Sequence, residues 1–369
     1  IKSWQLIDSD TNNPWHGINR WRAKVVDYWQ QNIGDPSVRA LLLALSVGDK
    51  SQFDQDDFKR FQDTGTAHLI AISGLHIGMM AAMGYALAWF LFALVPQERF
   101  ARPQIQALTG WLFAAMYAGM AGLALPTLRA MLMLSVFLLF KIIKRRAFAW
   151  DVWCVSVFVM LLIDPLGVLD WGFFLSFGAV AVLIFTFNGV DGKSRWWMWL
   201  KAQWVLLLGL MPFQLLVLGR LTWAAPLVNF IAIPFMTIAI VPLLFFVMLC
   251  QFIFGAAPAI LLQLLVTFCH WFYGLLAWFE RVPFLSFDVV ALTTWQWVLL
   301  FVVLLVVLLP KVMPQRFWAL LLLLPLVVNQ QATLPAGHFK AQFFDVGQGL
   351  AVAIHTENHH MLYDVAAAY

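Results

Sequence analysis

Long runs of apolar residues fill the middle of the chain, from residue 68 to residue 329. A helix needs about 20 mostly apolar residues to cross a bilayer, and runs near that length predict nine spanning helices and a short tenth. The expected spans are 69–95, 104–120, 124–140, 149–163, 171–187, 197–218, 225–250, 257–279 and 293–310, with the short run at 317–329. The residues before 68 and after 329 have mixed polarity, so the chain divides into three zones.

The first zone, residues 1–67, contains helical patterns that are too short or too polar to span. Trp21, Val25, Tyr28 and Trp29 fall on one face of a predicted helix, opposite basic residues. Such a pattern is typical of a helix on a membrane surface, and packing against a soluble domain would produce the same pattern. The apolar run 38–47 is also shorter than a span. We interpret this zone as amphipathic helices on the membrane surface.

The third zone, residues 330–369, changes to the period of β-strands. Strand patterns at 339–346, 350–355 and 361–365 are separated by the turn-forming residues 347–349 and by a polar turn at 356–359. This order predicts the first β-meander of a soluble domain. Since the chain starts at Ile1 and stops at Tyr369 within a strand pattern, we expect it to be a piece of a longer protein.

The composition excludes a water-soluble globular protein. Apolar residues make up 62% of the chain and charged residues 11%, whereas ordinary soluble domains carry about 25% charged residues. The three cysteines each lie in an apolar run, which does not fit a disulfide framework. The predicted fold class is therefore a mostly α, polytopic membrane protein with amphipathic surface helices and a truncated β-meander.

The placement of charge predicts the orientation, although the net charge is only +4. Lysine and arginine gather in the loops after the first, third, fifth and ninth spans, which the positive-inside rule assigns to the cytoplasm. Both terminal zones are then extracytoplasmic, provided that the run 317–329 crosses the bilayer. If it does not cross, the C-terminal zone is cytoplasmic.

Polar residues within the expected spans are candidate functional residues, because a charge at mid-membrane costs about 2.5 to 3.5 kcal/mol on insertion scales. At about 1.5 Å per residue, His76 lies roughly 12 Å below the outer end of its span, and Arg129 and Ser176 lie roughly 8 Å below theirs. Other polar residues of the same outer half are Ser73, Gln214, Asn229 and His270, whereas Lys201 lies near the cytoplasmic end, where a lysine can anchor.

Arg129 is the residue of this set that cannot shed its charge. No acidic residue is expected at its depth within a span, so we predict that it faces a hydrated vestibule or an anionic ligand.

Two further patterns in the spans concern helix packing. Gly74 and Gly78 form a Gly-x-x-x-Gly pair that allows close helix approach. The prolines at 226, 234 and 242 predict either a broken, cavity-lining helix or a kinked one.

The segment 66–78, TAHLIAISGLHIG, closely resembles the signature of the ComEC family of competence DNA-uptake channels. His68, Ser73 and His76 belong to this segment. Further segments resemble the family in the right order: 44–49 (ALSVGD), 125–130 (LPTLRA), 164–165 (DP), 172–177 (GFFLSF) and 226–229 (PLVN). The run 344–349 (FDVGQG), followed by Tyr363 and Asp364, is similar to the opening of the family's metallo-β-lactamase-like domain, which singles out Asp345, Gly347, Gln348, Gly349 and Asp364.

The resemblance implies an inner-membrane channel that passes one strand of incoming DNA to the cytoplasm, as part of natural transformation. Its partners would be single-stranded DNA, the lipid bilayer, and DNA-receptor and DNA-processing proteins. An OB-like domain and the family's first spans would precede residue 1, and residues 1–67 would hold the extracytoplasmic edge of that domain together with the surface helices. Residues 68–329 would form the channel, and residues 330–369 would begin the metallo-β-lactamase-like domain. The metal-ligand motif expected after Asp364 is missing. We therefore expect no cofactor and no nuclease activity in this chain, and zinc or manganese in the missing domain.

Two other functions fit the residues alone. A transporter of a small anionic solute would use the same Arg129 and a broken helix. An intramembrane enzyme would use Ser73 as nucleophile and His76 as base, since the two are three residues apart on one helical face. The histidines 355, 359 and 360 resemble a metal site in composition only, because they fall in and around a predicted turn without further ligands.

Overall fold

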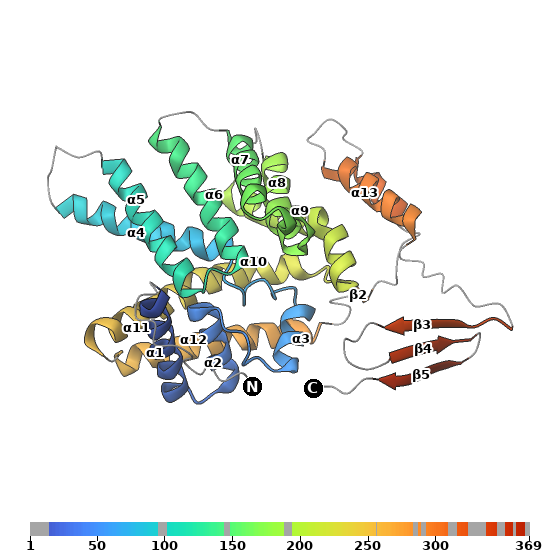
Figure 1. Ribbon diagram of the computed structural model, residues 1–369, viewed down its shortest axis with the longest axis horizontal. Coiled ribbons are helices and arrows are strands. Elements are labelled where there is room, and N and C mark those ends of the chain that lie inside the picture. The colour runs from blue at the N-terminus through green and yellow to red at the C-terminus, as the bar shows by residue number, and fades with distance from the viewer. Residues whose placement is uncertain are drawn as a thin grey trace. The chain divides into compact units, whose positions relative to one another are not determined.

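The computed structural model describes residues 15–94, 102–143, 148–187, 194–255, 257–282, 287–288, 293–308, 316–323, 337–344, 351–356 and 359–365. The chain forms two compact units, Ile1–Ala319 and Leu320–Tyr369. The first unit is helical and the second contains a small sheet (Figure 1). The predicted fold class is thereby confirmed.

The helices of the first unit follow the expected apolar runs closely. They are α1 (Trp15–Asn32), α2 (Pro36–Val47), α3 (Gln55–Asp63), α4 (Gly74–Leu94), α5 (Arg102–Met120), α6 (Leu125–Ile142), α7 (Ala149–Ile163), α8 (Trp171–Phe187), α9 (Arg195–Leu218), α10 (Ala225–Phe235), α11 (Val241–Phe254), α12 (Ala259–Glu280) and α13 (Thr294–Leu308). Short helical turns precede α8 (η1, Pro165–Leu169) and follow α13 (η3, Arg316–Leu323).

Five helical segments are long and apolar enough to cross a membrane: Gly74–Ala93, Leu125–Ile142, Trp196–Val217, Ala225–Phe254 and Ala259–Glu280. Shorter apolar helices cover the expected spans 149–163 and 171–187 and part of 293–310. The chain is accordingly a multi-pass membrane protein. Of the tenth expected span, only the 3-10 turn up to residue 323 lies within the described residues.

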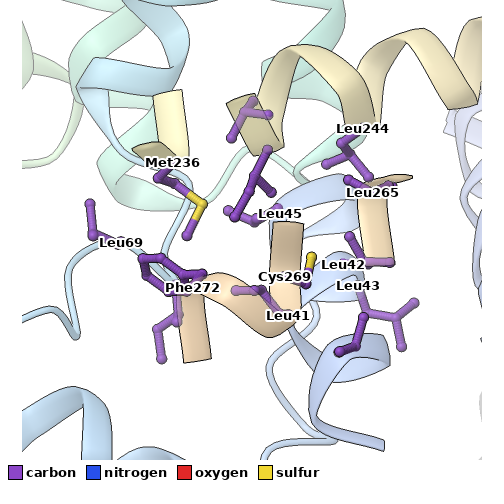
Figure 2. Packing of buried hydrophobic residues seen from close by; sticks show 14 of the residues in the cluster. Leu41, Leu42, Leu43, Leu45, Leu69, Met236, Leu244, Leu265, Cys269 and Phe272 are labelled. Atoms are coloured by element: carbon purple, nitrogen blue, oxygen red, sulfur yellow. The ribbon is translucent and has the colours of Figure 1, made fainter. Parts of the chain in front are cut away.

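The main apolar core lies between the N-terminal helices and α10–α12. Leu41, Leu42, Leu43 and Leu45 of α2 are all fully buried, which means that this helix is covered on every side (Figure 2). Phe272 of α12 packs in the same cluster. The N-terminal zone therefore shares one core with the helices that follow residue 67. Whether α1 also touches the membrane surface stays a prediction.

The prolines of the run 225–254 do not break it. A π-helical turn, η2 (Met236–Ile240), joins α10 to α11. A proline cannot donate a backbone hydrogen bond, and a π-turn is a known way to accommodate the disturbed ladder. The Thr237 hydroxyl adds a bond of 2.7 Å to the carbonyl of Ile233. Of the two alternatives drawn from the sequence, the kinked helix is the one observed.

The α10–α11 rod runs crosswise to α6–α8 rather than beside them (Figure 1). Phe245 of α11 contacts Tyr117 near the end of α5, with ring centroids 4.7 Å apart. At the end of α11, Phe252 contacts Trp21 of α1, whereas the next residue, Arg22, meets Gly122 in the α5–α6 turn. The α1 helix thus contacts both the end of α11 and the α5–α6 turn. If the spans simply alternated, the end of α11 and the α5–α6 turn would lie on opposite faces of the bilayer. Hydropathy gives the length of a helix but not its crossing angle, so the sequence could not show this packing.

The second unit contains the expected antiparallel meander. Its strands are β3 (Lys340–Phe344), β4 (Ala351–His355) and β5 (His360–Val365), in the order β3-β4-β5 with a register shift between Ala351 and Val352. His355 pairs with His360 across the strands. Asp345, Gly347, Gln348 and Gly349 lie outside the described residues. The backbone of Asp364 lies in β5, and its role stays a prediction.

Candidate functional site

The N-terminal ends of α4, α6 and α8 gather in the first unit, and the loop before α4 leads to the start of α10. Gly74, the first residue of α4, faces Ala130 of α6, and a methyl group on Gly74 would lie 3.5 Å from the Ala130 side chain. Gly172, the second residue of α8, faces Arg129 of α6. The loop 64–73 before α4 contacts Ala225 at the start of α10 through Gly65. The expected segments 66–78, 125–130, 172–177 and 226–229 therefore come together.

Gathered helix starts create a positive electrostatic environment. Each helix N-terminus carries roughly half a positive charge and several backbone N–H groups without helical partners. A helix start is also a ready anion-binding element. The side chains around these helix starts determine whether the site can use that property.

His76 is fully buried on the first turn of α4. Its Nδ1 atom accepts a hydrogen bond from the Ser73 backbone N–H at 3.2 Å and lies 3.2 Å from the Ser73 hydroxyl. Because Nδ1 accepts, the neutral ring carries its proton on Nε2. That Nε2 atom is buried and has no hydrogen-bond partner among the described residues. By strict hydrogen-bond geometry His76 thus presents an unpaired donor, and its ring also interacts with the Ala71 backbone.

The Ser73–His76 pair does not form a complete hydrolytic arrangement. A nucleophile and its base are usually oriented by a third group that bonds the other ring nitrogen. Nδ1 of His76 already faces Ser73, and no carboxylate bonds its Nε2 in the described part of the chain. His68, in the loop before α4, is exposed and lies within electrostatic range of the His76 ring. The geometry gives no support to the intramembrane enzyme.

Arg129 is 3% exposed and has an acidic partner that the sequence did not indicate. Its Nη2 atom lies 3.0 Å from Oδ2 of Asp170, and its Nε donates to the Leu125 carbonyl at 3.2 Å. The sequence indicated no acidic residue at the depth of Arg129 within a span, and the inference that Arg129 therefore needs water or a ligand as partner overlooked Asp170 in the loop before α8. Asp170 was assigned to a loop between spans, and a long guanidinium side chain reaches it from α6. The remaining Nη1 atom is buried without a partner among the described residues.

Gly172 keeps the space that this ion pair needs. A methyl group at Gly172 would lie 2.9 Å from Oδ2 of Asp170 and 3.0 Å from Nη2 of Arg129. The Gly172 N–H also donates to Oδ1 of Asp170 at 3.1 Å. An Asp-x-Gly sequence directly at the start of an apolar helix was the available signal for this part of the site. Ser176, one turn further along α8, is half-buried.

Asn229 of α10 connects to the loop before α4. Its Nδ2 atom lies 3.5 Å from the Gly65 carbonyl, and its Oδ1 atom is buried without a partner among the residues described. His270 does not join this group, because its Nε2 lies 3.0 Å from Oδ2 of Asp35, the N-cap residue of α2.

The contact between α4 and α5 also differs from expectation. Nothing lies within 4 Å of a methyl group placed on Gly78, whereas one on Gly84 would lie 2.8 Å from Phe113.

In its chemistry, the site is a set of hydrogen-bond donors around helix starts. His76 Nε2 and Arg129 Nη1 are both buried and unpaired, and both are donors. Unsatisfied buried donors cost about 1 to 3 kcal/mol each, more when charged, so they favour an acceptor-rich or anionic partner. Among the described residues no group of three or more His, Cys, Asp or Glu side chains could hold a metal ion.

Comparison with known proteins gives consistent matches. A sequence profile described as Competence protein matches residues 45–314. Competence protein ComA of Neisseria gonorrhoeae is 34% identical over 365 residues, which cover 95% of this chain and 51% of that protein. Recombination protein 2 of Haemophilus influenzae is 34% identical over 242 residues, covering 62% of this chain and 31% of that protein.

ComE operon protein 3 of Bacillus subtilis is 29% identical over 255 residues, covering 67% of this chain and 30% of that protein. The chain thus spans about half or less of the length of these curated relatives. No solved structure matches it.

Proposed function

The chain belongs to the Competence protein (ComEC) family, and we propose that it is the membrane channel part of a DNA-uptake protein. In this proposal, single-stranded DNA passes the gathered starts of α4, α6 and α8, beside the loop that contacts α10, on its way into the cytoplasm. The observation that carries the proposal is the pair of buried, unpaired donors on His76 and Arg129 beside these helix starts. They suit a phosphate chain, because every nucleotide brings anionic acceptor oxygens.

A DNA channel has to contact phosphates without holding them. Phosphate contacts carry no sequence information, and they weaken as salt rises. Asp170 supports such weak contact, because it neutralises part of the Arg129 charge through Nη2 and leaves Nη1 free for an acceptor. Asn229 offers one more polar atom near the same loop. His68, Ser73 and Ser176 are proposed to line the path with them.

The rest of the uptake protein is also a proposal. The meander of residues 340–365 would begin a metallo-β-lactamase-like domain, and an OB-like domain would precede the first unit. Zinc or manganese would bind in the part of that domain absent from this chain, and any nuclease would require it. Partners would include a DNA receptor outside the inner membrane and DNA-processing proteins in the cytoplasm.

We propose that both ends of the chain face away from the cytoplasm. The ion pairs Arg60–Glu280 and Arg220–Asp63 join α3 to the ends of α12 and α9, two places assigned to the same side. Cysteines introduced as Lys59→Cys and Thr356→Cys, in a Cys154→Ser background, should react with an impermeant thiol reagent outside the cytoplasm. Protection of either cysteine until the cytoplasm is opened would reverse the assignment.

The central experiment is transformation by variants of Arg129 in a naturally competent host that lacks its own copy. We expect Arg129→Leu to reduce transformation to the level of the deletion strain. Arg129→Lys should keep part of it, because lysine supplies a point charge without the planar fork. Lys141→Leu is the matched control, since Lys141 lies at the other end of α6 over the Tyr85 ring.

Two further measurements separate the channel from its alternatives. Labelled double-stranded DNA should still accumulate outside the inner membrane in the Arg129→Leu strain, and the variant should be inserted at normal amounts. If Arg129→Leu transforms at the normal frequency, the proposed phosphate contact is wrong. If deletion of the whole gene leaves transformation unchanged, the chain is not the DNA channel, and a small-anion transporter becomes the better reading of the site.

A further inference from the structure

An apolar cavity of about 590 Å³ lies between α1, α4, α5 and α11. On one side it is lined by Gly17 and Trp21 of α1, and on the other by side chains of α11 from Pro242 to Phe252. Those positions span ten residues, which is about 15 Å along a helix. The cavity is therefore long, and its wall is almost entirely hydrocarbon. It is separate from the donors at the helix starts.

A second pocket of about 300 Å³, whose lining includes polar side chains, adjoins the first and shares Trp21, Met248 and Phe252 with it. It lies at the last turn of α11, where Lys24 of α1 and Gln251 of α11 line it. The Oε1 atom of Gln251 is buried and has no hydrogen-bond partner among the described residues. A buried amide oxygen without a partner is a costly arrangement that a hydrogen-bond donor would relieve.

The two compartments together match an amphipathic ligand. A polar head with a negative charge and hydroxyl donors would meet Lys24 and Gln251, and a long apolar tail would extend along α11. Water makes few hydrogen bonds against an apolar wall, and apolar cavities take apolar ligands. Basic pockets between membrane helices are typical sites for anionic lipid heads. We infer that this double pocket binds one anionic phospholipid whose head carries hydroxyl groups, such as phosphatidylglycerol.

The lipid has a structural role in this arrangement. It lies where α1 meets α11, and it fills the space left beside the contact of Trp21 with Phe252. The crossing of α11 over α5 leaves the space, because Tyr117 and Phe245 contact each other edge to face there, at 88° between the ring planes. A lipid acyl chain bound beside Tyr117 and Phe245 would hold the α1 helix against the place where α11 crosses α5.

The test is native mass spectrometry of the protein taken from nanodiscs that contain equal amounts of phosphatidylglycerol and phosphatidylcholine. The unaltered protein should retain one phosphatidylglycerol in preference to phosphatidylcholine. Lys24→Gln should lower the affinity for phosphatidylglycerol about fivefold, the effect of one lysine near an anionic surface. It should leave the affinity for phosphatidylcholine nearly unchanged.

A cavity-filling variant tests the apolar part. Nothing lies within 4 Å of a methyl group placed on Gly17, so the first carbon that Gly17→Leu adds to the cavity wall has room. Displacing about two methylenes of the lipid tail should lower its affinity about tenfold. Gly274→Leu is the matched control, because Gly274 is equally open in α12 and does not line the cavity. Lys59→Gln of α3 is the control for charge.

Gly17→Leu is not expected to unfold the protein, since leucine favours a helix over glycine. Thermal unfolding of each variant in detergent checks this point. Equal lipid retention by the unaltered protein, Lys24→Gln and Gly17→Leu would overturn the inference. Loss of a dimer in Gly17→Leu, with no lipid bound to the unaltered protein, would also overturn it and assign the cavity to a second copy of the chain.

Discussion

The ion pair between Arg129 and Asp170 should respond asymmetrically to the loss of either partner. The Arg129 side chain is 3% exposed, whereas that of Asp170 is 44% exposed. Removing the carboxylate charge with Asp170→Asn leaves a buried guanidinium. Its Nη1 atom has no hydrogen-bond partner among the described residues, and its Nη2 atom then lacks a charged one. Removing the guanidinium with Arg129→Gln leaves a carboxylate that water can reach. The burial of the charge left behind therefore determines which change costs more.

The expected magnitudes follow from that difference. Breaking a buried pair and leaving the buried charge costs about 3 to 5 kcal/mol, and we take about 3 kcal/mol for Asp170→Asn because the amide still accepts one bond. Loss of an exposed pair costs about 0 to 1 kcal/mol, so we expect about 1 kcal/mol for Arg129→Gln. The double variant should be about as stable as Arg129→Gln alone, which gives a coupling energy of about 3 kcal/mol.

Unfolding in mixed detergent, followed by tryptophan fluorescence, measures these differences. Equal costs for the two single variants, or a larger cost for Arg129→Gln, would refute the argument from burial. Transformation provides the second readout. The double variant should keep its fold and lose DNA uptake, because it restores stability without restoring a cation. Normal uptake by the double variant would show that Arg129 serves only to pair with Asp170.

Three further changes test the surroundings of the site and the core. Gly172→Ala should destabilise the protein by about 1 kcal/mol or more in the same assay, because overpacking outweighs the gain in helix propensity. Gly178→Ala is the control and should not destabilise the protein, because its added methyl group would meet only an ordinary contact at 3.7 Å. Tyr117→Phe should cost about 1 to 2 kcal/mol, since it removes a buried bond of 2.8 Å to the Leu45 carbonyl. Burial alone would raise the pKa of the Asp35 carboxyl, but bonds from His270 and the α2 amides outweigh it and lower the pKa below the ordinary 3.8. The stability that these bonds to the Asp35 carboxylate supply is complete above the ordinary pKa and is lost as the pH falls through the lower pKa of the folded protein. Asp35→Asn should therefore flatten the acid side of a curve of unfolding free energy against pH, below about pH 4.

Much of the helical pattern was predictable because apolar run length and turn residues are local properties. The starts of α4, α6, α8 and α10 fell within a few residues of the expected span starts, and so did the three strands of the meander. The segments that resemble the competence family also marked the site, and four of them meet in space. These successes depend on information that lies within 20 residues of sequence.

The errors have a common cause in long-range packing. The apolar run of α2 was expected on a surface because it is too short to span, yet it is buried between helices that follow much later in the chain. The partner of Arg129 lies 41 residues away and was assigned to a loop. The crossing of α11 over α5 depends on the shapes of side chains such as Tyr117 and Phe245. None of these properties is encoded in a local period.

The burial of α2 has a consequence for the order in which the protein is made. Its N-cap residue Asp35 bonds His270, which lies 235 residues later, and the Ser37 carbonyl accepts from Tyr273, 236 residues later. At about 5 to 20 residues per second during synthesis, these partners leave the ribosome roughly 12 to 47 s after α2 does. Throughout that interval an apolar helix too short to anchor itself must be sheltered by the insertion machinery or by a chaperone. Maturation of this core therefore waits for α12 to capture a helix that was made more than 200 residues earlier.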